Sequence, residues 1–254
     1  MPTTTSYTVK SGDTLSSIAA HFGLSLADLV AANPQIHDPN LIQVGEQIAI
    51  PNSGGNPAPV GGQYDGSHPA PGTTSMDRSH YVHPPLSNTA GNRSPAEYDD
   101  LINQFAVAHN PRYTPDAHAT YCNIFMWDVT RAMNAEIPHW ITANGGIAAP
   151  GAPGAREIVI NEGVDWLHDH GAEHGWQALS QASAAQARAN QGYPTVVVWK
   201  NPNPAHHGHT AMVRPGTFDA RGVTMAQAGA HNYNSIKFGQ IFPAGASAKY
   251  YTHD

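Results

Sequence analysis

The sequence has few basic residues, a single cysteine and no long apolar run, and each shortage excludes a class of protein. Of 254 residues, 12 are Lys or Arg and 19 are Asp or Glu, so the formal net charge is −7. Nucleic-acid binding depends on clustered basic side chains, and we therefore expect no nucleic-acid partner. A lone cysteine, Cys122, cannot form an internal disulfide, so the fold must be stable without one.

The missing apolar runs bear on localisation. No stretch approaches the roughly 18 consecutive apolar residues of a membrane span, so none is expected. The opening residues, MPTTT, have neither the positive charge nor the apolar segment of a secretory signal peptide. We expect a protein made in the cytoplasm that reaches the cell wall or periplasm after lysis or by a route other than Sec, such as a dedicated secretion machine or a phage particle.

Composition divides the chain into three parts. Residues 5–51 show a compact apolar pattern, residues 52–93 are rich in Gly, Pro, Ser, Asn and His, and periodic apolar segments return over residues 94–254. Chain rich in Gly and Pro packs poorly and favours extended conformations, which predicts a flexible linker over residues 52–93. The hydrophobic content of 40% is enough for a folded core at either end.

The first part predicts the order strand, helix, helix, strand. A short strand over residues 7–9 leads into a turn and a helix that ends at Gly23, a second helix ends at Asn33-Pro34, and a strand covers residues 47–50.

The segments YTVKSGDTLSSIAAHFGLSLADLVAANP and LIQVGEQIAIP, which produce this order, resemble a LysM domain. That family binds N-acetylglucosamine-containing glycans, as in peptidoglycan and chitin, in a shallow groove between its two strand-helix loops. The resemblance implies a groove formed by Gly12, Asp13, Thr14 and Leu15 on one side and by Asn33, Pro34 and Ile36 on the other. Asp13 or Thr14 also suits a helix N-cap and Asn33-Pro34 a helix stop, and these roles are compatible with binding.

The third part opens with a helix-start signal. Ser94, Pro95 and Glu97 form a capping box, which predicts a helix that buries Leu101 and Phe105.

A second helix is predicted from Thr120, a candidate N-cap, to about Ala135. Its first turn holds Cys122, and its apolar face continues at Phe125, Met126, Val129 and Met133. A helix N-terminus and a neighbouring imidazole can lower the pKa of a thiol and make it a strong nucleophile. The alternative is that Cys122 is an inert core residue.

Downstream strands supply a candidate base. An apolar strand over residues 195–199 precedes a strand that His209 opens, and a strand ending at Gln227 is soon followed by Asn232. If the face that carries His209 packs against the helix of Cys122, imidazole and thiol meet. Gln227 or Asn232 would then orient the imidazole, as Asn does in papain-like sites.

Residues 113–242 resemble the bacterial papain-like cell-wall hydrolases of the NlpC/P60 and CHAP families, in which a Gly-His strand follows a helix-borne Cys. The sequence departs from the pattern at Tyr121-Cys122-Asn123, where NlpC/P60 enzymes usually show Asp-Cys-Ser, and at Gln227 or Asn232, where His, Asn or an acid is commoner. The resemblance implies an α+β domain with helices packed on an antiparallel sheet. It also implies cofactor-free cysteine hydrolysis of an amide in peptidoglycan, either within the stem peptide or between muramic acid and L-alanine.

Two other functions stay open. The protein could be a non-catalytic peptidoglycan-binding component of a wall or phage tail, with Cys122 in its core. It could also be a metal-dependent hydrolase built on His168, Asp169, His170 and His174, although no H-E-x-x-H order is present and 16 histidines make chance clusters common. Between an endolysin and a secreted effector, the sequence does not decide; an effector would have an immunity protein as a further partner.

Overall fold

A computed structural model describes residues 5–10, 15, 18, 29–30, 32–36, 42–50, 68–117 and 119–254. The chain forms two compact units, Met1–Gln63 and Tyr64–Asp254. Each unit has its own apolar core. Within the described residues, no helix is both long and apolar enough to cross a membrane.

In the first unit, a two-stranded antiparallel sheet carries the core. β1 (Thr5–Thr8) pairs with β2 (Gln47–Ile50), with Thr5 opposite Ile50. Positions 15, 18, 29 and 30 are helical, and Leu15, Ile18 and Leu29 are buried with Ile48. These elements lie where the sequence predicted them.

The second unit is built on a six-stranded sheet in the order β5-β10-β6-β7-β8-β9, in which every neighbouring pair is antiparallel. The strands are β5 (Gln177–Leu179), β6 (Thr195–Trp199), β7 (His209–Val213), β8 (Thr224–Gln227), β9 (Tyr233–Lys237) and β10 (Lys249–Thr252). β6 is buried along nearly its whole length, as its continuous apolar run predicts. The sheet places β7, which begins with His209, between two other strands.

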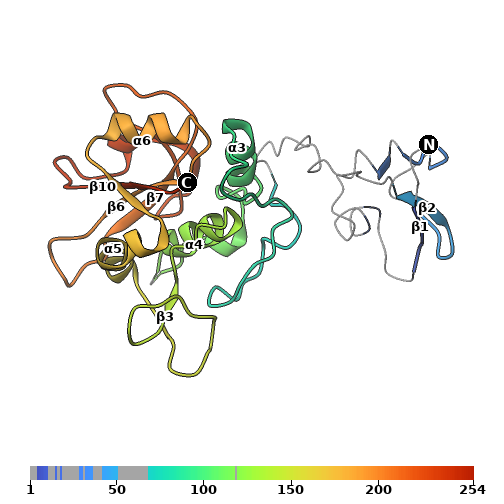
Figure 1. Ribbon diagram of the computed structural model, residues 1–254, viewed down its shortest axis with the longest axis horizontal. Helices are drawn as coiled ribbons and strands as arrows, with labels where there is room; N and C mark the ends of the chain where they lie inside the picture. Colours follow the sequence, from blue (N-terminus) through green and yellow to red (C-terminus); the bar gives the residue numbers. More distant parts are fainter. Residues whose placement is uncertain are drawn as a thin grey trace. The chain divides into compact units, whose positions relative to one another are not determined.

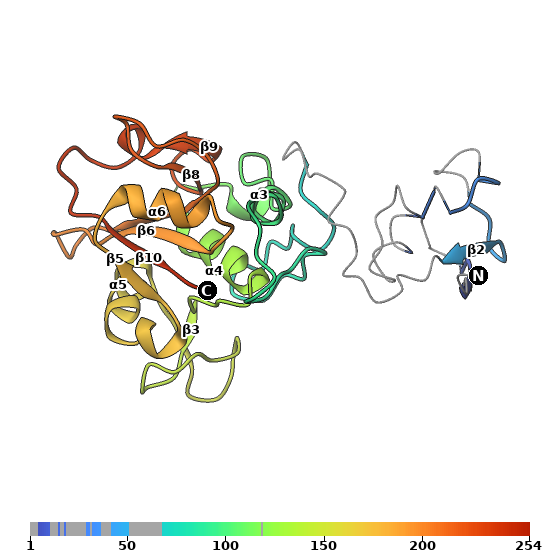
Figure 2. The ribbon, with the colours of Figure 1, turned by 45° about the horizontal axis from the view of Figure 1, so that its top comes forward.

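Helices cover the sheet. They are α3 (Pro95–Asn103), α4 (Cys122–Ala132), α5 (Ile160–Asp169) and α6 (Ala182–Ala189), and a small hairpin joins β3 (Trp140–Ile141) to β4 (Arg156–Glu157). In both ribbon views, α6 lies on one side of β6 and β10 and α5 lies on the other (Figures 1 and 2). Mixed helices and antiparallel sheet agree with the predicted α+β class.

The predicted helix start accounts for α3, whereas the predicted N-cap of the next helix, Thr120, is wrong, because α4 has Tyr121 at its N-cap and no side-chain cap. The Ser94 side chain accepts a hydrogen bond from the Glu97 backbone N–H at 3.2 Å, which is one of the two bonds of a capping box, and the Ser94 hydroxyl donates to the Glu97 carboxylate at 3.0 Å. α4 buries Phe125, Met126 and Val129. The Thr210 hydroxyl in β7 donates to the Met126 sulfur at 3.1 Å, so α4 and β7 are in direct contact.

The predicted linker is wrong for residues 68–93, which we call the strap, because they pack on the second unit. Val82 is 2% exposed in the main core, and the Ala70 N–H donates to the Gln104 carbonyl at 2.7 Å. Three strap carbonyls, at Ser75, Asp77 and His80, accept from the Arg112 guanidinium at distances of 2.8 to 3.0 Å. Composition could not predict this, since backbone carbonyls make the contacts. Residues 52–67 lie outside the described part.

Behind the strap, Arg112 forms a buried ion pair with Asp128 of α4. The Arg112 Nε and the Asp128 carboxylate are 2.7 Å apart, and both side chains are fully buried. The Tyr113 hydroxyl donates to the same carboxylate at 2.8 Å. A buried ion pair is favourable only when its remaining hydrogen bonds are also satisfied, and the strap carbonyls satisfy those of Arg112. The strap is therefore part of the fold that supports α4.

Candidate functional site

Cys122 is the first residue of α4 and lies at an uncapped helix N-terminus. Its side chain is 3% exposed, and the N-cap residue, Tyr121, makes no side-chain hydrogen bond to the helix. The first N–H groups of a helix have no partner within the helix, so here they are free to face the sulfur or a ligand. The site therefore begins with a thiol at the positive end of a helix.

The thiol is less acidic than the sequence suggested. Burial raises the pKa of Cys122 to about 11, although the backbone N–H groups of Thr210, Asn123 and Cys122 itself lower it. Our expectation of a lowered thiol pKa is therefore wrong for this state of the protein. At neutral pH, Cys122 is therefore a protonated thiol.

His209 begins the strand that contacts the sulfur. Thr210, whose N–H faces the Cys122 thiol, is the next residue of β7, so the sulfur lies beside the start of this strand. Gly208 is required just before it, because a Cβ there would lie 2.1 Å from the Trp199 carbonyl oxygen. The close approach of these backbones explains why glycine precedes His209.

The half-buried His209 and the buried Gln227 form a polar pair. The His209 Nε2 and the Gln227 Oε1 are both buried, and neither has a hydrogen-bonding partner of ordinary geometry in the described structure. Burial lowers the pKa of His209 to about 4, against the opposing effect of hydrogen bonding to Gln227. The Gln227 Nε2 donates to the His231 carbonyl at 2.5 Å, which leaves Oε1 for the imidazole. Hydrogen bonds of catalytic groups are often long before substrate binds.

Gly229 and Phe242 enclose this pair. A Cβ on Gly229 would lie 2.7 Å from the Gln227 Oε1 and 3.3 Å from the His209 Cε1. The Phe242 ring lies 5.2 Å from the His209 ring, centroid to centroid. Sequence reasoning missed both residues, although the Gly in Ala228-Gly229-Ala230 was a usable signal of a close approach.

Asn232, the other candidate orienter, is bound elsewhere. Its Nδ2 donates to the Tyr113 carbonyl at 2.8 Å, and its Oδ1 accepts from the Gly229 N–H at 2.9 Å. The first bond holds the loop after β8 against the segment that precedes α4, and the second closes the loop itself. The structure brings Gln227, rather than Asn232, to the imidazole.

The strap contributes a side chain next to the site. The Arg78 guanidinium lies 3.8 Å from the centroid of the Tyr121 ring, directly before Cys122. Its Nε donates to the Arg112 carbonyl at 2.7 Å, and the Tyr121 hydroxyl donates to the Asp116 carboxylate. Arg78 was missed because it lies in the segment that composition assigned to a linker.

The groove residues expected in the first unit have different placements. Gly12, Asp13 and Thr14 lie outside the described residues. Leu15 and Ile36 are core residues, 1% and 8% exposed, and Pro34 is exposed.

Asn33 is fully buried and ties the second helical segment to β2. Its Nδ2 donates to the carbonyls of Leu29 and Ala49 at 2.7 and 2.8 Å, and its Oδ1 accepts from the Ala49 N–H at 2.7 Å. In this structure, the Asn33 side chain has a structural role.

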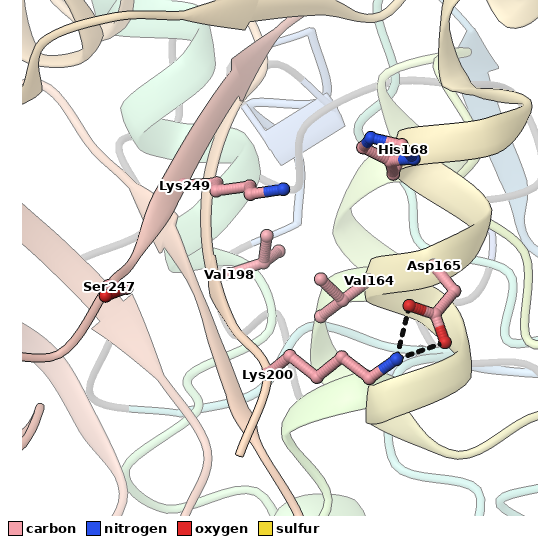
Figure 3. A pocket seen from close by; sticks show the side chains of 7 residues that line it. All are labelled: Val164, Asp165, His168, Val198, Lys200, Ser247 and Lys249. Carbon is pink, nitrogen blue, oxygen red and sulfur yellow. Dashed lines mark hydrogen bonds and ion pairs between the residues drawn. The ribbon is translucent and has the colours of Figure 1, made fainter. Parts of the chain in front are cut away.

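The His168 region lies at a different cavity (Figure 3). This cavity has a volume of about 250 Å³ and is lined by Val164, Asp165, His168, Val198, Lys200, Ser247 and Lys249. Lys200 pairs with Asp165 at 2.5 Å, and His168 pairs with Asp169 at 2.7 Å. The ammonium groups of Lys200 and Lys249 both line this cavity, and their positive charges would repel a metal cation. In the described residues, no three His, Cys, Asp or Glu side chains are grouped as metal ligands would be.

The family match to known proteins lies within the first unit. A family model described as LysM domain matches residues 7–51. This match confirms the LysM prediction and supports binding to a peptidoglycan- or chitin-like glycan.

Two curated proteins are similar over short alignments. The secreted LysM effector ECP6 of Passalora fulva is 50% identical over 46 residues, which are 18% of this chain and 20% of that protein. An endolysin of Bacillus phage PZA is 48% identical over 52 residues, 20% of each chain. The chain thus spans about a fifth of the length of each of these relatives.

Proposed function

We propose that the protein is a peptidoglycan hydrolase that cleaves an amide bond by cysteine nucleophilic catalysis and that its LysM domain holds it on the wall. One observation carries this proposal. The sulfur of Cys122 lies at an uncapped helix N-terminus, beside the start of β7, where His209 is paired with Gln227 at the end of β8. A helix-borne cysteine with a strand-borne histidine is the arrangement of the NlpC/P60 and CHAP families.

The two buried atoms without a partner, the His209 Nε2 and the Gln227 Oε1, indicate the role of each His209 nitrogen. With Nε2–H directed to the Gln227 Oε1, the lone pair on Nδ1 is left to accept a proton from the thiol. The pKa of about 4 means that His209 is neutral at the pH of the cytoplasm or periplasm, as a base must be. Thiol and imidazole are thus both neutral before the reaction, and the proton moves during the attack.

The reaction follows from these assignments. The Cys122 sulfur attacks the amide carbonyl carbon while its proton passes to the His209 Nδ1, and backbone N–H groups at the start of α4 stabilise the oxyanion. The C–N bond breaks, and Nδ1 returns the proton to the leaving amine. Water then hydrolyses the thioester with His209 as the base, releasing a carboxylic acid and restoring the thiol. The bond is an amide of the stem peptide or the amide between muramic acid and L-alanine.

The LysM domain would hold the hydrolase domain at the cell wall. Binding of one module to the wall raises the effective concentration of the other at its substrate, which offsets weak affinity for a heterogeneous polymer. The similarity to a phage endolysin supports a role in wall lysis. The protein would reach the wall after lysis or by an export route other than Sec.

A panel of variants on purified sacculi tests this proposal. Cys122→Ser and His209→Ala should both abolish the decrease in turbidity, because one removes the nucleophile and the other its base. His206→Ala and His207→Ala are matched controls that should keep activity, since both histidines are exposed in the preceding loop. Activity in the Cys122→Ser protein would refute the cysteine mechanism.

A second function is favoured by the burial of Cys122. A 3% exposed thiol with a pKa of about 11 also suits a core residue of a non-catalytic glycan-binding protein. If this second function is correct, none of the four variants would differ from the wild-type protein in its effect on the turbidity of sacculi. The wild-type protein would bind sacculi without clearing them.

A further inference from the structure

A buried histidine that the proposed reaction does not use lies beside Asn123, the residue after the nucleophile. His139 is 7% exposed, and its Nδ1 lies 3.4 Å from the Asn123 Nδ2. Its Nε2 lies 3.6 Å from the Glu157 carboxylate. Asn123, His139 and Glu157 therefore form a chain of polar side chains that starts next to Cys122 and ends at the surface of β4.

The position of His139 is fixed by packing as well as by these contacts. Its ring lies 5.1 Å from the Trp127 ring and 6.5 Å from the Trp140 ring, centroid to centroid. The His139 carbonyl accepts from the Ile158 N–H at 2.9 Å, which anchors its backbone. An imidazole held by two neighbouring aromatic rings and at its backbone can hold a neighbouring side chain in one orientation.

The charges around His139 assign its tautomer. The two charged groups that act on it are the Glu157 carboxylate and the Arg112 guanidinium. Burial and Arg112 keep the pKa of His139 below its usual value, while Glu157 opposes them. The imidazole is therefore neutral, with Nε2–H directed to the carboxylate and the Nδ1 lone pair directed to an N–H of Asn123.

This arrangement leaves half of the Asn123 amide unused. An asparagine side chain has two N–H donors and a carbonyl acceptor, and His139 takes one donor. In the described structure, the second N–H and the Oδ1 have no partner, and the side chain is only half-buried. A peptide group offers one acceptor and one donor, which complement these two free groups.

We propose that Asn123 binds the peptide group next to the scissile bond and that His139 and Glu157 are positioning residues that hold its amide in the binding orientation. This inference rests on the proposed function and extends it to substrate recognition. It requires a substrate with a peptide group beside the amide that Cys122 attacks, which a stem peptide provides. It also gives a reason for Asn at this position, where NlpC/P60 enzymes usually carry Ser.

The test is a double-mutant cycle on kcat/KM for a soluble muropeptide. Asn123→Ala should lower kcat/KM roughly tenfold, the loss expected for about one hydrogen bond. His139→Phe keeps the aromatic packing and removes the acceptor, so it should cause a similar loss, and the double variant should lose no more than either single variant. The rate at which iodoacetamide alkylates Cys122 should be the same in all of these proteins.

Controls separate the possible failures. His174→Phe, at a histidine whose ring packs against Trp166 with a centroid distance of 5.1 Å, should keep wild-type kcat/KM. If His139→Phe does not fold, Glu157→Ala replaces it in the cycle and should lower kcat/KM by a smaller factor than Asn123→Ala. Full activity of Asn123→Ala, or additive losses in the double variant, would overturn this inference while Cys122→Ser stays inactive. Activity in Cys122→Ser would instead refute the proposed function itself.

Discussion

Removing the strap should unfold the second unit, although the sequence indicates that these residues are dispensable. The informative comparison is between a chain that begins at Ser94, at the start of α3, and a chain that begins at Tyr64, at the start of the second unit. The shorter chain has every predicted helix and strand of the second unit. It lacks the carbonyls of Ser75, Asp77 and His80 that accept from Arg112.

The size of the effect follows from those contacts. Hydrogen bonds to a charged group contribute about 1.5–3 kcal/mol each, so the three carbonyls account for roughly 5–9 kcal/mol. Exposing the apolar surface that Val82 covers adds about 1.5–3 kcal/mol. A domain is usually stable by only about 5–15 kcal/mol, so the combined loss removes most or all of that stability. Arg112, the ion-pair partner of Asp128, would also lose part of its hydrogen bonding.

Circular dichroism and thermal unfolding measure the outcome. The chain that begins at Tyr64 should unfold cooperatively and turn over soluble muropeptides. The chain that begins at Ser94 should lack a cooperative transition or melt far below the longer chain. Equal melting temperatures would show that the strap contacts are not stabilising and would restore the linker prediction.

Three further predictions concern the site. The kcat/KM for a soluble muropeptide should stay constant from neutral pH down to about pH 5 and fall near the His209 pKa of about 4, because the base must be neutral; a fall near pH 6.5 would contradict the burial argument. Gln227→Ala should lower the rate and move that fall to lower pH, since Gln227 raises the pKa, whereas Asn232→Ala should lower the melting temperature and leave the pH profile in place. Gly229→Ala should reduce kcat on the order of 100-fold without unfolding the protein, because its Cβ would displace the Gln227 carbonyl by contact at 2.7 Å; wild-type kcat would show that the pair tolerates the shift.

Local signals in the sequence predicted the elements that carry the site. The capping box at Ser94 gave the start of α3, and the apolar spacing from Cys122 gave α4. The continuous apolar run of residues 195–199 gave a central strand. These predictions succeeded because capping and periodic burial act within one segment.

Features set by remote partners could not be predicted in this way. β10 lies between β5 and β6 because Tyr251 pairs with both Ala178 and Val196, and nothing within residues 249–252 specifies those partners. The order of strands in the sheet depends on such pairings. It is therefore a property of the whole chain.

The chemistry of the site shows the same limit. The sequence placed Cys122 and His209 on a helix and a strand, but the burial that sets both pKa values comes from packing around them. Choosing Gln227 over Asn232 required the hydrogen bonds of the folded loop. Asn123 and His139 are separated by a helix and a turn, so only the fold shows that they meet.

Mass spectrometry of the fragments released from purified sacculi tests the central claim most directly. The wild-type protein should release fragments in which one amide has gained a water molecule, exposing a new amine and a new carboxylic acid. Cys122→Ser protein of the same melting temperature should release none. The account would be contradicted by the same fragments from the Cys122→Ser protein, or by fragments cut only in the glycan strand.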